Sequence, residues 1–258
     1  MSTSLMVSDE GPVRILTLNR PRQLNALSGE MRHSIVSVLN QAKDDDTVRA
    51  VMITGAGDRG FCSGQDLNES AELDAGEGHE WQGAWKDYLL GFLQFPKPLV
   101  AAVNGVAAGG GFVTALLCDI RLAVPGARLI MLEINIGLPC MLGSFLLAQE
   151  LFWSRAKEMV LSGRDIEARE AKHMGIVHDI VEPDKLAARG LALARELAAK
   201  PPHAMRLNIQ RFRHMRRQAM EYNNVFEALE TYQGEAIASG EPQRVMAEFL
   251  AKRAARKN

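Results

Sequence analysis

The amino-acid sequence predicts an α/β fold followed by a purely helical region. Two observations carry this prediction. Short apolar runs of strand length, such as residues 50–54, alternate along the chain with helical patterns, and this alternation is typical of α/β domains. After Pro201-Pro202, three helical stretches follow with no strand between them. We therefore expect an α/β core over residues 1–198 and an all-helical part over residues 199–258.

The first elements of the core have recognisable start and stop signals. Residues 14–18 alternate partly in strand fashion and end at Asn19-Arg20-Pro21, which is a turn sequence. Ser28 is a suitable N-cap, because its hydroxyl accepts a hydrogen bond from a free N–H group of the first helical turn. The helix that follows has one apolar stripe, formed by Met31, Ile35, Val38, Leu39 and Ala42.

The middle of the chain changes character twice. Residues 68–90 carry several acidic side chains among small residues, so we expect a polar, mobile excursion there. The strand pattern resumes at residues 99–103, and a helix is expected after the three glycines at 109–111. Further strands are expected at residues 120–123 and 176–181, and further helices from Met141, Ser154 and Ile166.

Composition and charge exclude several classes of protein. Hydrophobic residues make up 47% of the 258 residues and charged residues 24%, as in an ordinary globular protein with one large core. A net charge of −1 gives no bulk attraction to nucleic acid or to an anionic membrane. No apolar run approaches the roughly 20 residues that span a bilayer, and no signal peptide is evident. We expect a cytoplasmic protein with no nucleic-acid or membrane partner.

The three cysteines give no sign of a disulfide framework or of a metal site. Cys62, Cys118 and Cys140 lie in apolar or glycine-rich stretches without ligand spacing. Reduced, buried thiols are therefore expected, and no metal is expected.

A glycine motif after the strand at 50–54 is a weak signal for dinucleotide binding. Residues 55–60 fit the pattern G-x-G-x-x-G. The third glycine is followed by Phe61-Cys62-Ser63-Gly64, whereas a dinucleotide-binding motif opens a helix at that point. We interpret residues 55–60 as a loop.

Two other glycine-bearing segments are more informative. Residues 61–67 (FCSGQDL) and 104–111 (NGVAAGGG) each follow a buried strand. Glycine allows backbone to approach a ligand closely, and the start of a helix leaves N–H groups without intrahelical partners. One N–H group from each segment can thus converge on a single oxygen and stabilise negative charge there.

With the sequences LNRP at residues 18–21 and NALS at 25–28, these segments resemble the crotonase (enoyl-CoA hydratase/isomerase) superfamily along most of the chain. The resemblance implies a spiral of ββα units, C-terminal helices that associate into homotrimers or dimers of trimers, and an acyl-CoA substrate. It also assigns the oxyanion-hole donors to the backbone N–H groups of Gln65 and Gly110. No redox cofactor or metal is implied, because coenzyme A is part of the substrate.

The segment LIMLEINIGLP, at residues 129–139, matches the family segment that carries a catalytic glutamate, here Glu133. A carboxyl group in such an apolar run is costly to bury as an anion, so its pKa is expected to be raised. Family hydratases place a second glutamate two residues after the glycine triple, where this chain has Val113. One carboxyl group favours Δ3,Δ2-enoyl-CoA isomerisation over hydration.

The resemblance also suggests residues that contact coenzyme A or the acyl group. Arg22 matches a position that is basic in relatives, although an exposed turn arginine is an equal alternative; Asn135 either binds substrate or stabilises the turn. The full set consists of Arg22, Leu24, Ala26, Ser63, Gly64, Val113 and Asn135. Two basic clusters, at residues 206–217 and 252–257, form solvated helix faces or reach the coenzyme phosphate of a neighbouring subunit. Asp66 and Asp119 are interpreted as structural.

Two alternatives stay open. Hydratase or hydratase-lyase activity needs a second group beside Glu133; His79 and Glu80 are candidates, although solvated loop residues are the simpler interpretation. A CoA-binding oligomer without catalytic activity is the alternative of a different class, and Val113 is its only support.

Overall fold

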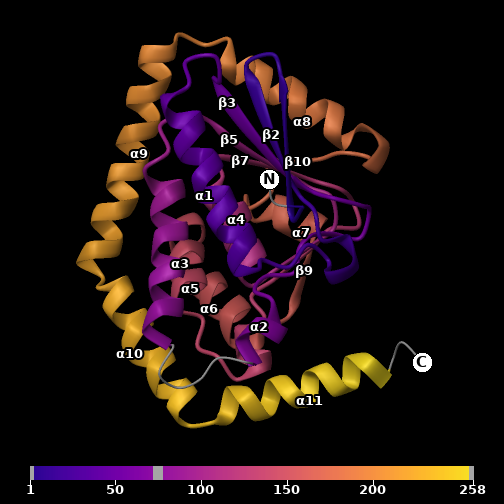
Figure 1. The fold of residues 1–258 in the computed structure, drawn as a ribbon, viewed down its shortest axis with the longest axis vertical. Coiled ribbons are helices and arrows are strands. Elements are labelled where there is room, and N and C mark those ends of the chain that lie inside the picture. The colour runs from indigo at the N-terminus through magenta and orange to yellow at the C-terminus, as the bar shows by residue number, and fades with distance from the viewer. Residues whose placement is uncertain (1–2, 72–77, 256–258) are drawn as a thin grey trace.

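The computed structural model describes residues 3–71 and 78–255 (Figure 1). The described residues form two β-sheets. The larger sheet has six strands in the order β1-β2-β3-β5-β7-β10. Its strands are β1 (Leu5–Glu10), β2 (Val13–Leu18), β3 (Ala50–Gly55), β5 (Leu99–Val103), β7 (Ile120–Ala123) and β10 (Asp179–Ile180). The smaller sheet has four strands in the order β4-β6-β8-β9, namely β4 (Gly60–Cys62), β6 (Val106–Ala108), β8 (Arg128–Ile130) and β9 (Asp165–Glu167).

A ββα unit repeats along the core. In each repeat the first strand (β3, β5, β7) joins the larger sheet and the second (β4, β6, β8) joins the smaller one, always parallel to its counterpart from the neighbouring unit. A helix follows each pair of strands: α2 (Leu67–Ala71) and α3 (Gly78–Leu93), α4 (Gly110–Leu117), or the short 3-10 helix η2 (Glu133–Ile136) and α5 (Met141–Glu150). This is the spiral that the sequence resemblance implied.

The remaining helices cover the sheets and extend the chain. They are η1 (Pro21–Gln23), α1 (Gly29–Asp44), α6 (Trp153–Ser162), α7 (Ala168–His173), α8 (Pro183–Ala198), α9 (Pro202–Tyr222), α10 (Val225–Ala238) and α11 (Glu241–Ala255). As predicted, Ser28 caps α1, since its hydroxyl accepts a hydrogen bond from the N–H of Met31. Residues 55–60 comprise the end of β3, a loop and the first residue of β4, so a strand and not a helix follows the glycine motif.

Three local predictions were wrong. Much of the expected polar excursion is α3, whose Tyr88 and Leu89 are fully buried because apolar residues recur on one face of the helix. The strand expected at 176–181 shortens to β10, and the helix expected from Ile166 begins only at Ala168, because Ile166 itself pairs with Leu129 in the smaller sheet.

The helices after residue 201 wrap around the core rather than standing apart from it. In Figure 1, α9 runs along one side and α11 crosses the base of the molecule. Among the contacts that hold α9, Arg213 pairs with Asp119 at 3.0 Å and Arg216 pairs with Glu150 at 2.6 Å. The first basic cluster is therefore not one solvated face, because two of its arginines turn inward.

No helix in the described part of the chain is long and apolar enough to cross a membrane. The three cysteines are unpaired and buried, as predicted.

Candidate active site

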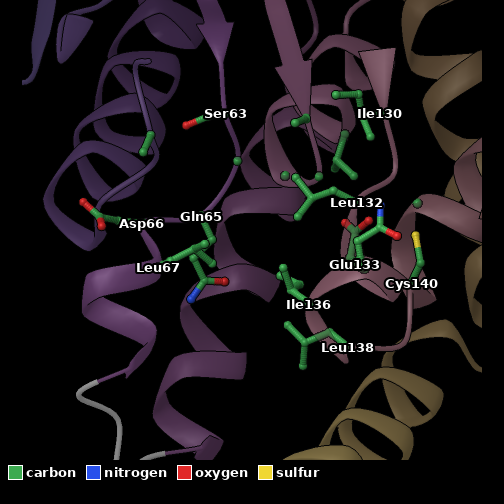
Figure 2. Close-up of a pocket in the computed structure, with 18 of the residues that line it drawn as sticks. Ser63, Gln65, Asp66, Leu67, Ile130, Leu132, Glu133, Ile136, Leu138 and Cys140 are labelled. Carbon is green, nitrogen blue, oxygen red and sulfur yellow. The ribbon is translucent and has the colours of Figure 1, made fainter. Parts of the chain in front are cut away.

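A cavity of about 840 Å³ opens where the three ββα units meet. The two glycine segments, the η2 region and the C-terminal helices all contribute to its lining. Figure 2 shows Ser63, Gln65 and Asp66 on one side of this cavity, with Glu133 and Cys140 on the opposite side.

The two glycine segments lie directly against each other. Gly64 has φ +90°, and a Cβ atom placed on it would lie 2.6 Å from the carbonyl oxygen of Ala108 and 3.2 Å from the amide nitrogen of Gly110. Only glycine tolerates both this conformation and this approach. The next residue, Gln65, and the first residue of α4, Gly110, both line the cavity. The sequence-predicted donors are thus neighbours at one point of the wall.

The N–H of Gly110 is available because of its place in the helix. As the first residue of α4, it has no carbonyl group four residues earlier within the helix to which it can donate. The partial positive charge at a helix N-terminus further favours an oxyanion there.

The carboxyl group of Glu133 also lies beside the glycine triple, and it comes from the η2 segment. It begins η2, and its carbonyl oxygen accepts a hydrogen bond from the N–H of Leu138, which folds the segment back on itself. A Cβ atom on Gly109 would lie 3.2 Å from Oε1 of Glu133, so the carboxyl group borders the glycine triple. Its other oxygen, Oε2, is buried and has no hydrogen-bond partner among the described residues.

The environment of Glu133 suits proton transfer. Burial raises the pKa of this carboxyl group, as the sequence predicted. Hydrogen bonds from the backbone N–H of Glu133 itself and from the Cys140 thiol oppose the rise only in part. The pKa of the thiol is raised by burial and by the nearby carboxylate, so Cys140 stays protonated and remains a donor. Sequence reasoning treated Cys140 only as a buried thiol and missed this contact.

Val113 lies at the position of the second glutamate in family hydratases. It belongs to α4, is 4% exposed and lines the cavity. Its methyl groups neither titrate nor bind water. The side chains of His79 and Glu80 lie outside the described residues.

Trp85 on α3 is a site residue that sequence reasoning missed. A Cβ atom on Gly110 would lie 2.5 Å from Cη2 of Trp85, which places the indole against the oxyanion segment. Behind the ring, the buried guanidinium of Arg32 lies 4.8 Å from the ring centroid. The helical spacing of Trp85, Tyr88, Leu89 and Phe92 was the signal that identifies a buried face here.

The residues proposed to hold coenzyme A are brought together at one end of the cavity. Arg22, Leu24, Ala26, Ser63 and Gly64 all line it, and Arg22 is exposed. Leu24 has φ +51°, an unusual conformation for leucine.

The buried side chain of Asn25 stabilises this turn, since its amide donates to the carbonyl oxygens of Ala56 and Gly60. Asn135 also lines the cavity, but its amide donates to the carbonyl oxygen of Gly163 at 2.7 Å, which fits the structural alternative.

Both aspartates interpreted as structural have structural partners. Asp66 pairs with Arg20 at 2.6 Å and accepts a hydrogen bond from the N–H of Asn68 at the start of α2. Asp119 accepts from the N–H of Leu99 and pairs with Arg213. These interpretations are confirmed.

The C-terminal helices of the same chain complete the cavity wall. Their contribution is almost entirely apolar and consists of Leu229, Gln233, Met246, Phe249 and Leu250. Helical periodicity in this region was visible in the sequence, but periodicity does not say which surface a helix covers.

A family model described as "Enoyl-CoA hydratase/isomerase" matches residues 9–256. The chain belongs to this family, within the crotonase superfamily. A short-chain-enoyl-CoA hydratase of Clostridium acetobutylicum is 31% identical over 97% of this chain and 95% of its own length. A 1,2-epoxyphenylacetyl-CoA isomerase of Escherichia coli is 35% identical over 95% of this chain and 94% of its own length.

Solved structures support the same assignment. An enoyl-CoA hydratase/isomerase from Mycobacterium paratuberculosis superposes with a TM-score of 0.87 at 26% identity, covering 96% of this chain and 99% of that one. Another from Pseudoalteromonas atlantica gives 0.85 at 30% identity, covering 96% and 97%. The chain is therefore an enzyme of a family that acts on acyl-CoA thioesters.

Proposed function

We propose that this protein is a Δ3,Δ2-enoyl-CoA isomerase with Glu133 as its single acid/base. The observation that carries the proposal is the buried carboxyl group of Glu133 beside the glycine triple, in a cavity that Val113 also lines. The backbone N–H groups of Gln65 and Gly110 hold the thioester oxygen.

The proposed cycle moves one proton between two carbons. The carboxylate of Glu133 removes a proton from C2 of a 3-enoyl-CoA, and the electron pair of the broken C–H bond delocalises into the thioester carbonyl. The resulting dienolate oxygen is stabilised by the two N–H groups; one such donor contributes about 3 to 4 kcal/mol to lowering a barrier. Glu133 then returns the proton to C4, leaving the 2-enoyl-CoA. The cycle needs no metal or redox cofactor.

Isomerisation and hydration differ in whether the site must hold and activate a water molecule. Hydration requires a water molecule to be oriented and deprotonated beside C3, and a second carboxylate is the usual means. The apolar side chain of Val113 offers no hydrogen bond to such a water molecule. Hydratase activity remains the second candidate, because several similar proteins, including the Clostridium relative, carry hydratase names.

An assay with crotonyl-CoA and a 3-enoyl-CoA, run side by side, tests the proposal. The 3-enoyl substrate should gain conjugated-thioester absorbance while crotonyl-CoA stays unchanged. Glu133→Gln should reduce the gain about 10³-fold, as expected for the loss of a general acid/base. Loss of crotonyl-CoA absorbance that depends on Glu133 would establish hydration instead.

We also propose that the chain assembles as a homotrimer or a dimer of trimers. Large apolar side chains are exposed on the single chain, among them Phe152, Trp153 and Phe212, at 87%, 72% and 71% exposure. Exposed apolar surface of this kind is typical of interfaces. Light scattering on the purified protein gives the mass directly, and a monomer would contradict the proposal.

A further inference from the structure

Gln233 is an amide on the otherwise apolar inner face of α10. The buried residues of this helix are Val225, Leu229 and Gln233, spaced four residues apart, so they share one face. Gln233 is 9% exposed and lines the cavity. An aliphatic side chain is expected at a buried position of this face, but the chain has the polar side chain of Gln233 there.

The carbonyl oxygen of the Gln233 amide lacks a hydrogen-bond partner in the part of the chain that the structure describes. This atom, Oε1, is buried. The other cavity residues of α10 and α11 are Leu229, Met246, Phe249 and Leu250, none of which donates a hydrogen bond. A buried amide without a partner is destabilising, and native proteins contain few of them. The missing partner is therefore expected to come from a ligand.

We propose that Gln233 binds a hydroxyl group on an otherwise apolar acyl chain of the substrate. This inference rests on the proposed function. A hydroxyl group both donates and accepts, so it pairs with the amide in either of the amide's two orientations. A plain alkyl chain would leave the amide unpaired.

A carboxylate on the acyl chain fits this wall less well. An ionised carboxylate can only accept hydrogen bonds, so it pairs with the NH2 group of the amide and never with Oε1. It would also be buried without a counter-charge from α10 or α11, because the one cation among the described residues that line the cavity is Arg22, which belongs to η1. The acyl group that satisfies both the amide and its apolar surroundings is thus a hydroxylated aliphatic chain.

Binding measurements test the proposal independently of turnover. Calorimetry would compare saturated acyl-CoA esters of increasing chain length, each paired with its terminal-hydroxyl counterpart. At the length that brings the hydroxyl to Gln233, the hydroxylated ester should bind about tenfold more tightly, as expected for one well-made hydrogen bond. Gln233→Met keeps the side-chain length and should remove or reverse this preference.

A melting measurement and a matched control variant distinguish loss of the hydroxyl contact from a general loss of folding. The free Gln233→Met protein should melt at a higher temperature than the wild type, because an unpaired buried amide has been removed. Gln243→Met is the matched control: Gln243 is exposed on α11 and outside the cavity lining, and this variant should keep the hydroxyl preference.

Equal affinities at every chain length, or a preference that persists in Gln233→Met, would overturn the hydroxyl subsite. If the 3-enoyl-CoA is still isomerised in that case, the proposed function stands without it. Failure to bind any acyl-CoA would overturn both.

Discussion

At the residue scale, the burial of Glu133 and the hydrogen bonds to its carboxyl group are expected to set the pH range of the proposed reaction. Burial raises the pKa of Glu133, whereas hydrogen bonds from its own backbone N–H and from the Cys140 thiol lower this pKa by stabilising the carboxylate. Since the carboxylate form accepts the proton, kcat/KM should fall as pH falls through this pKa. Cys140→Ala should move that acid limb to higher pH, while Cys140→Ser, which keeps a donor, should stay near the wild type. An unchanged or lowered limb in the alanine variant would show that the thiol does not act on Glu133.

Stability should respond to the same group with a defined sign. A carboxyl group whose pKa is raised on folding binds more protons in the folded state than in the unfolded state. Its contribution is therefore fully present below the unfolded pKa and is lost as pH rises through the folded pKa. We expect Glu133→Gln to melt at a higher temperature than the wild type near neutral pH, with the difference vanishing in acid. Melting curves at several pH values check this, and a less stable variant at neutral pH would contradict it.

A residue of the candidate site was predictable from sequence only where its neighbours in the same short segment also indicate its environment. Glu133 lies in an apolar run and the glycines lie after strands, so both were found. Trp85 and Gln233 reach the cavity through the packing of whole helices. Nothing in the residues next to them in sequence reports that packing.

At the scale of elements, α9 is held to the core by a buried arginine. Arg213 donates to the carbonyl oxygen of Phe92 at 2.8 Å and pairs with Asp119, and burial lowers its pKa in spite of the carboxylate. Removing one partner of such a pair leaves the other uncompensated.

Arg213→Met should therefore lower the free energy of unfolding by about 2 kcal/mol, somewhat less than for a fully buried pair because Asp119 is partly exposed. Denaturant titration measures the loss. Arg211→Met, at an exposed position on the same helix, should stay within about 0.5 kcal/mol of the wild type. Equal effects of the two substitutions would mean that the pair contributes no specific stability.

Long elements were predictable and the smaller sheet was not. The helix from Ser28 and the strands at 50–54 and 99–103 have several residues of clear periodicity. The strands of the smaller sheet have only three residues each, such as β6 and β8, and three residues cannot establish a period. The acidic composition near residue 75 similarly masked the apolar face of α3.

At the scale of the whole molecule, the last helix of the chain completes the wall of a cavity that is otherwise built mainly from the α/β core. α11 contacts η2 and α2, and its Phe249 lines the cavity. Phe249→Ala should weaken acyl-CoA binding about tenfold through the loss of apolar contact, with a smaller effect on kcat.

Glu248→Ala is the control for the helix itself, because Glu248 is exposed and forms a surface pair with Arg244. It should leave the binding constant unchanged. If Phe249→Ala binds acyl-CoA as well as the wild type does, α11 is not part of the acyl wall.

The position of Trp85 also gives the protein a built-in optical reporter. Its indole is buried against Gly110, whereas Trp153 is 72% exposed. Emission from Trp85 should be blue-shifted and protected from aqueous quenchers, and it should respond when a thioester displaces water from the cavity. Emission from Trp153 should be quenched readily whether or not ligand is bound. In a Trp81→Phe background, which removes the third tryptophan of the chain, site occupancy can thus be followed by intrinsic fluorescence, without a label and without turnover.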